Sequence, residues 1–137
     1  MINDKDVKRL SDAALEAMKH SYSPYSDFSV GAAILCSDGS IYSGTNIENA
    51  SFPAGICAER SALAAAVSAG HRDFEAIAVC GGKNGKAEDE CPPCGICRQM
   101  LSEFFSENAE FILISGKGTR KVSMKELLPL SFGKKML

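Results

Sequence analysis

The sequence predicts an α/β fold, a three-layer α/β/α sandwich built around a mixed sheet of about five strands. Apolar side chains at helical spacing alternate along the chain with short apolar runs of strand length. Glycine, proline and serine separate most of these segments, as turns require. The 137 residues have the length of one domain, and no internal repeat, low-complexity segment or linker divides them. Residues 1–137 are therefore expected to form a single domain.

The N-terminal third is expected to form a helix followed by a β-hairpin. Asn3 or Asp4 can cap the helix, whose apolar stripe continues to about His20. One strand is predicted over Ser29–Cys36 and a second over Ile41–Asn46. The sequence Ser-Asp-Gly-Ser between them is typical of a turn, which indicates that the two strands form a hairpin.

The rest of the chain continues to alternate helices and strands. Helices are predicted over residues 57–69, 94–105 and 123–128, the last with Ser and Glu at capping-box spacing. Strands are predicted over residues 74–80 and 111–115, with a short fifth strand over 120–122. Residues 47–56 and 81–90 are expected to be loops, because they carry proline, glycine pairs and charged runs.

The composition excludes several classes of protein. The formal net charge is −2, so the basic surface that a nucleic-acid-binding protein needs is missing. No apolar stretch approaches the length of a membrane span, and the polar N-terminal residues do not resemble a signal peptide. A cytoplasmic location is therefore expected. Six cysteines in such a chain indicate metal binding or catalysis rather than disulfides.

Three cysteines occupy positions from which they can bind one metal ion. Cys94 and Cys97 are three residues apart, so on a helix they lie on one face. Cys57 precedes Cys94 by 37 positions (94 − 57) and stands at the start of a different predicted helix. The free N–H groups at a helix start stabilise thiolates, which are the form that binds metals. Three protein ligands on zinc leave a fourth position open, as in a catalytic site.

The cysteines also allow other interpretations. Cys-x-x-Cys pairs occur in redox proteins and structural zinc sites, and a cysteine can simply be a buried core residue. Cys91 precedes Cys94 at the same spacing, so it could be a fourth ligand. A fourth thiolate would close the open metal position, and Glu59, the candidate proton carrier two residues after Cys57, would then have no catalytic role. Cys91 is therefore set aside as a ligand. Cys36 and Cys80 lie in predicted strands and are expected in the core.

Glu59 and Arg60 complete the predicted site. In the first turn of a helix, Glu59 can lean toward the same metal as Cys57 and move protons without being a ligand. A first-turn glutamate that only favours the helix dipole is the simpler alternative. Three thiolates would give a zinc centre a net charge of about −1. Arg60, and also Arg98, can offset this charge by donating to sulfur, while a surface salt bridge is the alternative for each.

The residues around the cysteines match a known pattern. Cys-Ala-Glu-Arg at 57–60, followed by Pro-Cys-Gly-Ile-Cys-Arg-Gln at 93–99, resembles the zinc signature of the cytidine deaminase family. The resemblance implies one Zn2+ per chain on Cys57, Cys94 and Cys97, with Glu59 carrying protons. Cys57 stands where many relatives have histidine, and the all-cysteine set is similar to that of the small nucleoside deaminases. A homotetramer with sites shared between subunits is implied by this resemblance alone.

The resemblance extends over most of the chain and assigns substrate contacts. Residues 25–33 resemble the family's early strand, whose aromatic residue packs on the pyrimidine, and residues 46–49 resemble the segment that binds the ribose hydroxyls. Residues 127–132 resemble the C-terminal segment that reaches a neighbouring subunit's site. The implied substrate-binding residues are Phe28, Asn46, Glu48, Ala58 and Phe132. The alternatives are a core-packing role for Phe28 and a place in an ordinary polar loop for Asn46 and Glu48.

Two positions depart from the family pattern. Ser29 stands where proline is common, and Phe52 stands where tyrosine is frequent. Neither change removes a catalytic group, so they affect the expected substrate preference rather than the reaction type.

The predicted function is zinc-dependent hydrolytic deamination of cytidine, and of deoxycytidine, in pyrimidine salvage. The predicted partner is a small nucleoside, with neither a nucleic acid nor a membrane. A blasticidin-type aminonucleoside deaminase is the nearest alternative, because it resembles this chain in its zinc motif. A structural zinc or thiol-redox module is an alternative of a different class, and it would require a fourth ligand or a Cys94–Cys97 disulfide.

Overall fold

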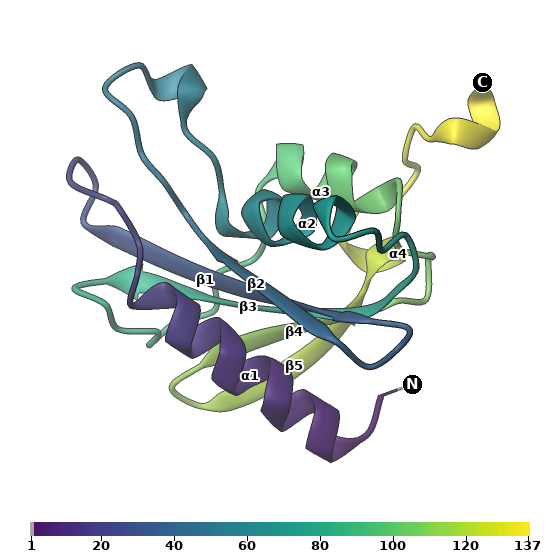
Figure 1. Cartoon of the computed structure of the whole chain (residues 1–137), viewed down its shortest axis with the longest axis horizontal. Helices are drawn as coiled ribbons and strands as arrows, with labels where there is room; N and C mark the ends of the chain where they lie inside the picture. Colours follow the sequence, from purple (N-terminus) through teal and green to yellow (C-terminus); the bar gives the residue numbers. More distant parts are fainter. Residues whose placement is uncertain (1) are drawn as a thin grey trace.

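The computed structural model describes residues 2–137 and contains a mixed five-stranded sheet with strand order β2-β1-β3-β4-β5 (Figure 1). All neighbouring strands are antiparallel except β3 and β4, which run parallel. The strands are β1 (Phe28–Cys36), β2 (Ile41–Thr45), β3 (Phe74–Lys83), β4 (Glu110–Ser115) and β5 (Gly118–Ser123). The predicted α/β class and the hairpin of the first two strands are confirmed.

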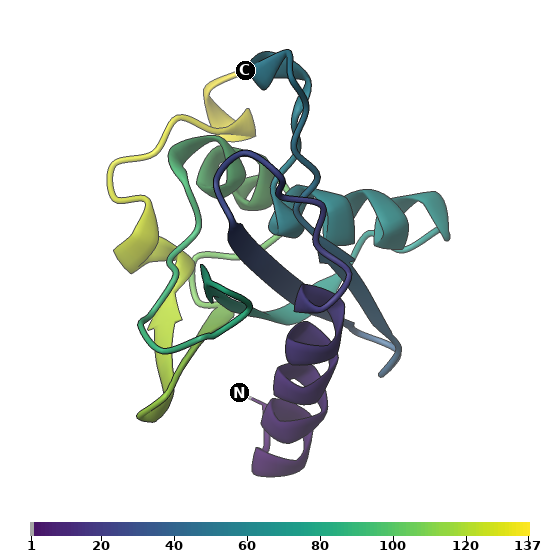
Figure 2. The same cartoon turned by 90° about the vertical axis from the view of Figure 1, so that its left-hand side faces the viewer.

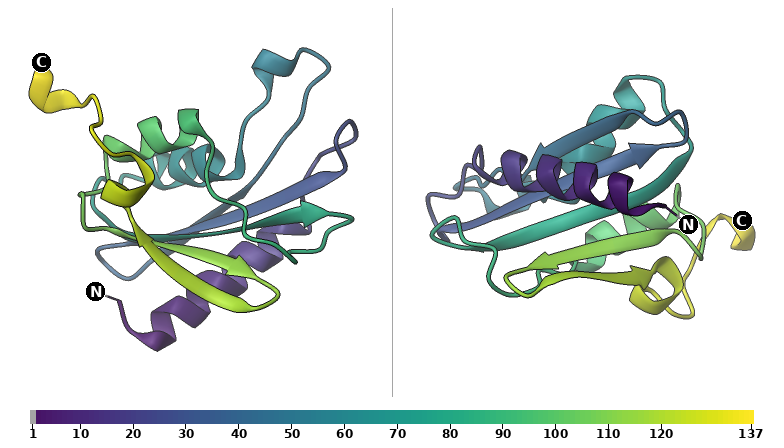
Figure 3. Two further views of the ribbon diagram at one scale, coloured as in Figure 1. Left: turned by 180° about the vertical axis from the view of Figure 1, so that it is seen from behind. Right: turned by 90° about the horizontal axis from the view of Figure 1, so that it is seen from below.

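Helices cover both faces of the sheet and make three layers. Helix α1 (Asp4–Met18) lies across one face, and α2 (Ala58–Ser68) and α3 (Gly95–Ser102) lie on the other (Figures 1 and 3). The Asn3 side chain caps α1 by accepting a hydrogen bond from the Asp6 N–H at 2.8 Å. Successive strand residues point to opposite faces, so each face packs its own set of small apolar side chains against its helices.

The connection from β3 through α3 to β4 places the start of α3 beside the start of α2. Parallel strands need such a crossover, because the chain leaves β3 at one end of the sheet and must enter β4 at the other end. Helix α2 begins after an extended residue, Cys57, and α3 begins after Cys94, which is extended in the same way. The fold thus brings two helix N-termini, 37 residues apart in sequence (94 − 57), to one end of the sheet.

The structure corrects the predicted boundaries at several points. The glycine pair at 81–82 was expected to open a loop, but both residues belong to β3, which continues to Lys83. A Cβ at Gly82 would lie 1.9 Å from the Lys86 carbonyl oxygen, so the missing side chain lets the following turn fold back onto the strand. Helix α3 ends three residues earlier than predicted (105 − 102), because Phe105 instead stacks against Phe74.

The remaining short elements differ less from expectation. Ser123 and Glu126 form the predicted capping box at the start of α4 (Met124–Leu127). Two 3-10 helices, at Phe52–Ala54 and Lys134–Met136, were not predicted. Residues 129–137 project away from the layers (Figure 3). Within residues 2–137, no helix combines the length and apolar character that crossing a membrane requires.

Candidate metal centre and active site

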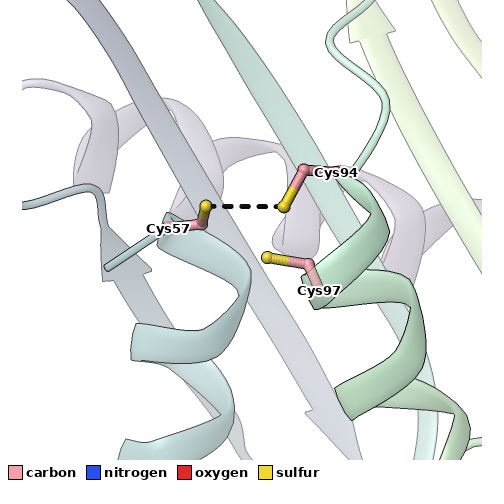
Figure 4. A group of neighbouring side chains, drawn as sticks. All are labelled: Cys57, Cys94 and Cys97. Carbon is pink, nitrogen blue, oxygen red and sulfur yellow. Dashed lines mark hydrogen bonds between the residues drawn. The ribbon is translucent and has the colours of Figure 1, made fainter. Parts of the chain in front are cut away.

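Three cysteine sulfurs meet between the starts of α2 and α3. The Sγ atoms of Cys57, Cys94 and Cys97 all lie within 4.8 Å of one another (Figure 4). Those of Cys57 and Cys94 are 3.7 Å apart. Tetrahedral zinc with Zn–S bonds of about 2.3 Å holds its sulfur ligands about 3.8 Å apart. The spacing of the sulfurs therefore fits a zinc ion bound by three cysteines.

The electrostatics of this cluster favour a thiolate at Cys57. Hydrogen bonds from the Cys97 thiol and from Arg60 lower the pKa of Cys57 to about 5. The hydrogen bond to Cys57 and burial raise the pKa of Cys97. The protein thus already stabilises one anionic sulfur, which is the state that metal binding requires.

Arg60 supplies the positive charge beside the sulfurs. Its Nη2 donates to Cys57 Sγ at 3.7 Å, and this bond raises the pKa of the guanidinium. Its Nε–H is buried and has no hydrogen-bond partner within residues 2–137. A buried donor without a partner is costly, but beside an anionic zinc–thiolate centre its dipole would be favourable.

Arg98 has a different task from either alternative weighed for it. Its Nε donates to the Pro93 carbonyl at 2.6 Å, and its Nη1 donates to the Leu127 carbonyl at 2.8 Å. The guanidinium therefore links the segment before α3 to the end of α4. Arg98 holds the helix that carries two of the sulfurs in place, and Arg60 alone of the two donates to sulfur.

Glu59 is the one charged residue that is buried among residues 2–137, with 3% of its surface exposed. Burial raises the pKa of its carboxyl group to about 7, although the nearby Arg60 opposes this shift. A carboxyl group with a pKa near neutrality can both accept and release a proton, as a general acid–base residue must. Its burial fits this chemical role better than a simple helix-dipole contact, which an exposed glutamate would make equally well.

A cavity of about 540 Å³ opens beside the sulfurs, and its volume is in the range of small-molecule sites. Its lining residues come mainly from the loops after α1 and β2 and from the segments at which α2 and α3 begin. The ribbon of these segments can be followed in Figure 2. The lining includes Tyr25, Asn46, Glu48, Phe52, Cys57, Glu59, Arg60, Cys91 and Cys94. A molecule in this cavity would contact the cluster and the Glu59 carboxylate together.

Asn46 and Glu48 line this cavity and also hold its loops together. Asn46 accepts from the Val30 N–H at 2.9 Å and donates to the Phe28 carbonyl at 2.8 Å. Glu48 accepts from the Tyr25 N–H at 2.9 Å and from the Ser26 hydroxyl, and the Ser26 bond lowers its pKa. Both residues therefore perform the structural work of a polar loop, and both remain exposed to the cavity.

The other predicted substrate contacts lie in different places. Ala58 is fully buried at the first position of α2, between Cys57 and Glu59. Phe28 lines a neighbouring hollow with the glycine pair of β3, outside the main cavity. Phe132 is 59% exposed on the C-terminal segment, where its carbonyl accepts from Gln99 at 3.0 Å. None of these three residues lines the cavity within the single chain, although Ala58 lies between two residues that do.

The structure adds residues that the sequence reasoning did not assign to the site. Tyr25 and Phe52 form an aromatic pair at the cavity, with ring centroids 6.1 Å apart. The aromatic residues beside Pro24 and Pro53 were the available signal, because exposed aromatic residues in loops often bind ligands. Cys91 also lines the cavity, but it is outside the sulfur cluster, and burial raises the pKa of its thiol to about 11.

Comparison with known proteins supports the same site. A family model for the cytidine and deoxycytidylate deaminase zinc-binding region matches residues 4–112. The cytidine deaminase of Sporosarcina psychrophila is 41% identical over 133 residues, which cover 96% of this chain and 95% of that protein. The crystal structure of cytidine deaminase from Burkholderia pseudomallei is similar with a TM-score of 0.83 at 41% identity, covering 91% of this chain and 98% of that one.

A related enzyme of different specificity is also similar. The blasticidin-S deaminase of Bacillus cereus is 34% identical over 107 residues, which cover 75% of this chain and 76% of that protein.

Proposed function

Because the chain belongs to the cytidine and deoxycytidylate deaminase family, we propose that it converts cytidine and water to uridine and ammonia. We propose deoxycytidine as a second substrate and pyrimidine salvage as the setting. One observation carries the proposal: three sulfurs lie at zinc spacing, and two of them, from Cys57 and Cys94, line a small-molecule cavity together with the buried carboxyl group of Glu59. The whole of residues 1–137 would act as one catalytic domain in the cytoplasm.

Cys57, Cys94 and Cys97 would hold one zinc ion. When bound, zinc would lower the pKa of a water molecule and thereby supply the nucleophile that attacks C4 of the pyrimidine. Arg60 would offset the negative charge of the thiolates, since it already donates to Cys57. The helix N-termini behind Cys57 and Cys94 would add to this compensation.

Glu59 would move the protons of the reaction. Its carboxylate would take a proton from the attacking water and deliver it to ring N3. It would then take the second proton of that water, from the hydroxyl group now on C4, and hand it to the departing amine, so that one residue serves as base and then as acid. Burial beside the cavity excludes bulk water from the carboxyl group and keeps this proton from being lost to solvent.

The nucleoside would bind between the loops that form the cavity. Asn46 and Glu48 are proposed to bind the ribose hydroxyls, and Ala58 to contact the base. Phe28 is proposed to pack on the pyrimidine and Phe132 to enter the site of a neighbouring subunit in a homotetramer. The projecting C-terminal segment supports this assembly, since Phe132 and its fully exposed neighbour Leu130 are apolar.

Substrate assays on the zinc-loaded protein test the proposal. Loss of cytidine absorbance with release of ammonia is expected, with deoxycytidine turned over as well. Faster turnover of blasticidin S would favour the alternative specificity that the Bacillus cereus relative represents. A protein with one zinc per chain but no turnover of any of the three nucleosides would indicate a structural zinc module instead.

A further inference from the structure

A second group of metal-ligating side chains lies at the opposite end of α2 from the active site. Cys57 precedes this helix, and His71 follows its C-terminal turn. Strand β1 connects the same two ends: Val30 lines the catalytic cavity, and Cys36 ends the strand. Six residues of extended chain separate these two by about 20 Å. Ligands at one end therefore cannot reach a metal at the other.

The second group consists of Cys36, Asp38 and His71. One ligand atom from each, the Cys36 sulfur, an Asp38 oxygen and a His71 nitrogen, lies within 4.8 Å of the others. His71 Nδ1 and Asp38 Oδ2 are 3.9 Å apart. Ligand atoms on tetrahedral zinc are about 3.3 to 3.8 Å apart, so a small contraction would bring all three to bonding distance. Sulfur, nitrogen and oxygen are the three donor types that zinc accepts.

Two of the three ligands, His71 and Asp38, are already oriented by a second contact that leaves a donor atom free. His71 Nε2 is hydrogen-bonded to the Tyr42 hydroxyl at 3.3 Å, which leaves Nδ1 toward Asp38. Asp38 Oδ1 accepts from the hydroxyl and the N–H of Ser40 at 2.6 and 3.0 Å, which leaves Oδ2 toward His71. Metal-binding histidines and carboxylates are held in this way by neighbouring groups.

The backbone around the group is held in a tight turn. The Cys36 N–H donates to the Ser40 carbonyl at 2.8 Å, and Gly39, with φ of 91°, donates back to Cys36 at 2.9 Å. The turn presents residues 36 and 38 to one side. Cys36 is buried, while the Asp38 side chain is 60% exposed. The three ligand atoms therefore lie where the core meets solvent, with Asp38 on the exposed side and the Cys36 sulfur on the buried side.

We propose that Cys36, Asp38 and His71 bind a second divalent transition-metal ion, with water in the fourth position. Zinc and cobalt fit the mixed sulfur, nitrogen and oxygen set, whereas magnesium and calcium prefer oxygen alone. Binding would release the Cys36 thiol proton. The bound ion would link the β1–β2 turn to the end of α2. Two arginines lie beside the group: Arg9 donates to the Gly39 carbonyl and is paired with Asp6 at 3.0 Å, and Arg72 donates to the His71 carbonyl at 2.8 Å.

Metal stoichiometry tests the proposal directly. Tag-free protein, first loaded with one zinc per chain, is titrated with Co2+ while the near-ultraviolet sulfur-to-cobalt absorption is recorded. The wild type is expected to bind a second equivalent with a new charge-transfer band from Cys36. Asp38→Asn and His71→Gln are expected to lose this equivalent and the band, yet to keep the first zinc and cytidine turnover.

The chain offers matched controls for both donor types. His20 is the other of the chain's two histidines, and Cys80 is a buried strand cysteine like Cys36. His20→Gln and Cys80→Ala should keep the second equivalent. A wild type that binds only one metal, or a second equivalent that survives His71→Gln, overturns the proposal and leaves an ordinary aspartate–histidine pair above a core cysteine. Asp38 lies in an exposed turn, so Asp38→Asn tests the site even if Cys36→Ala does not fold.

Discussion

The two clusters of metal-ligating side chains at the ends of α2, Cys57–Cys94–Cys97 and Cys36–Asp38–His71, differ in how their charge is balanced. At the start of the helix, three sulfurs lie beside two helix N-termini and the Arg60 guanidinium, all of which stabilise anions. At its end, burial raises the pKa of the Cys36 thiol, and the negative charge of the neighbouring Asp38 adds to this shift. The first arrangement prepares a thiolate before any metal arrives, whereas the second obtains one only when a metal displaces the proton.

The two clusters also differ in what surrounds the open metal position. The first faces a cavity with the buried Glu59, so a molecule bound there would meet both the proposed zinc ion and the proposed proton carrier. The second faces solvent across an exposed turn and has no buried carboxyl group among its neighbours within residues 2–137. The same donor atom, a cysteine sulfur, thus supports catalysis at one end and at most a structural link at the other.

Removing one sulfur from each cluster should separate them most sharply. Cys97→Ala is expected to abolish both tight zinc binding and cytidine turnover, because two sulfurs cannot replace the three-ligand site. Cys36→Ala should retain both, at a stability cost of about 1 kcal/mol for the small cavity left in the core. Zinc content after dialysis and cytidine turnover, measured on the same samples of both variants, test these expectations. Full activity in Cys97→Ala would contradict the assigned ligands.

Replacing Glu59 should separate metal binding from chemistry within the first cluster. Glu59→Gln keeps the size of the side chain but cannot carry a proton, so turnover should fall by a factor of about 100 to 10,000. Zinc content should stay at one per chain, because Glu59 is outside the sulfur cluster. Glu48→Gln is the control on the cavity wall and should raise KM more than it lowers kcat. A Glu59→Gln protein that lost its zinc would show that the residue is a ligand.

The catalytic cluster was predictable from sequence because its signals are local. Cys57 and Cys94 stand directly before helix starts, where extended backbone and free N–H groups recur, and Cys94 and Cys97 share one helix face. Only the meeting of the two helices required the fold, and the alternation of helices and strands indicated the crossover that provides it. The mixed sheet followed from the same alternation.

Features that depend on close approach between distant segments were not predictable. Gly82 gives a loop signal locally, but its place in β3 depends on the Lys86 carbonyl packing against it. Cys36 and His71 are 35 residues apart (71 − 36) and share no motif, so nothing local indicates that they meet. The positions of Phe28 and Phe132 depend on loop packing and on the C-terminal segment, which periodicity does not describe.

Neutralising Arg60 should have a smaller effect than removing a sulfur or the carboxyl group. The hydrogen bond from Cys97 lowers the pKa of Cys57 most, and Arg60 lowers it further. Arg60→Gln removes this second contribution, so zinc affinity should fall by about 10- to 100-fold. Saturating zinc should restore most of the turnover, which a direct catalytic role would not allow. Competition with a zinc chelator measures the affinity. Arg60→Lys should recover less than half of the zinc affinity that Arg60→Gln loses, because an ammonium group lacks the planar donors of the guanidinium.

The smallest effect on catalysis is expected at the far end of α2. His71→Gln should change kcat/KM for cytidine by no more than about twofold, because sites this far apart act independently. Excess zinc should raise the melting temperature of the wild type, because binding at the second site stabilises the folded state by about 2.7 kcal/mol when free zinc is a hundred times the Kd of that site. His71→Gln should remove this rise. Thermal unfolding with and without added zinc, followed by turnover on the same samples, separates the two properties. A large loss of turnover in His71→Gln would mean that the two ends of α2 are energetically coupled, and a zinc-induced rise equal to that of wild type would place the stabilising ion elsewhere.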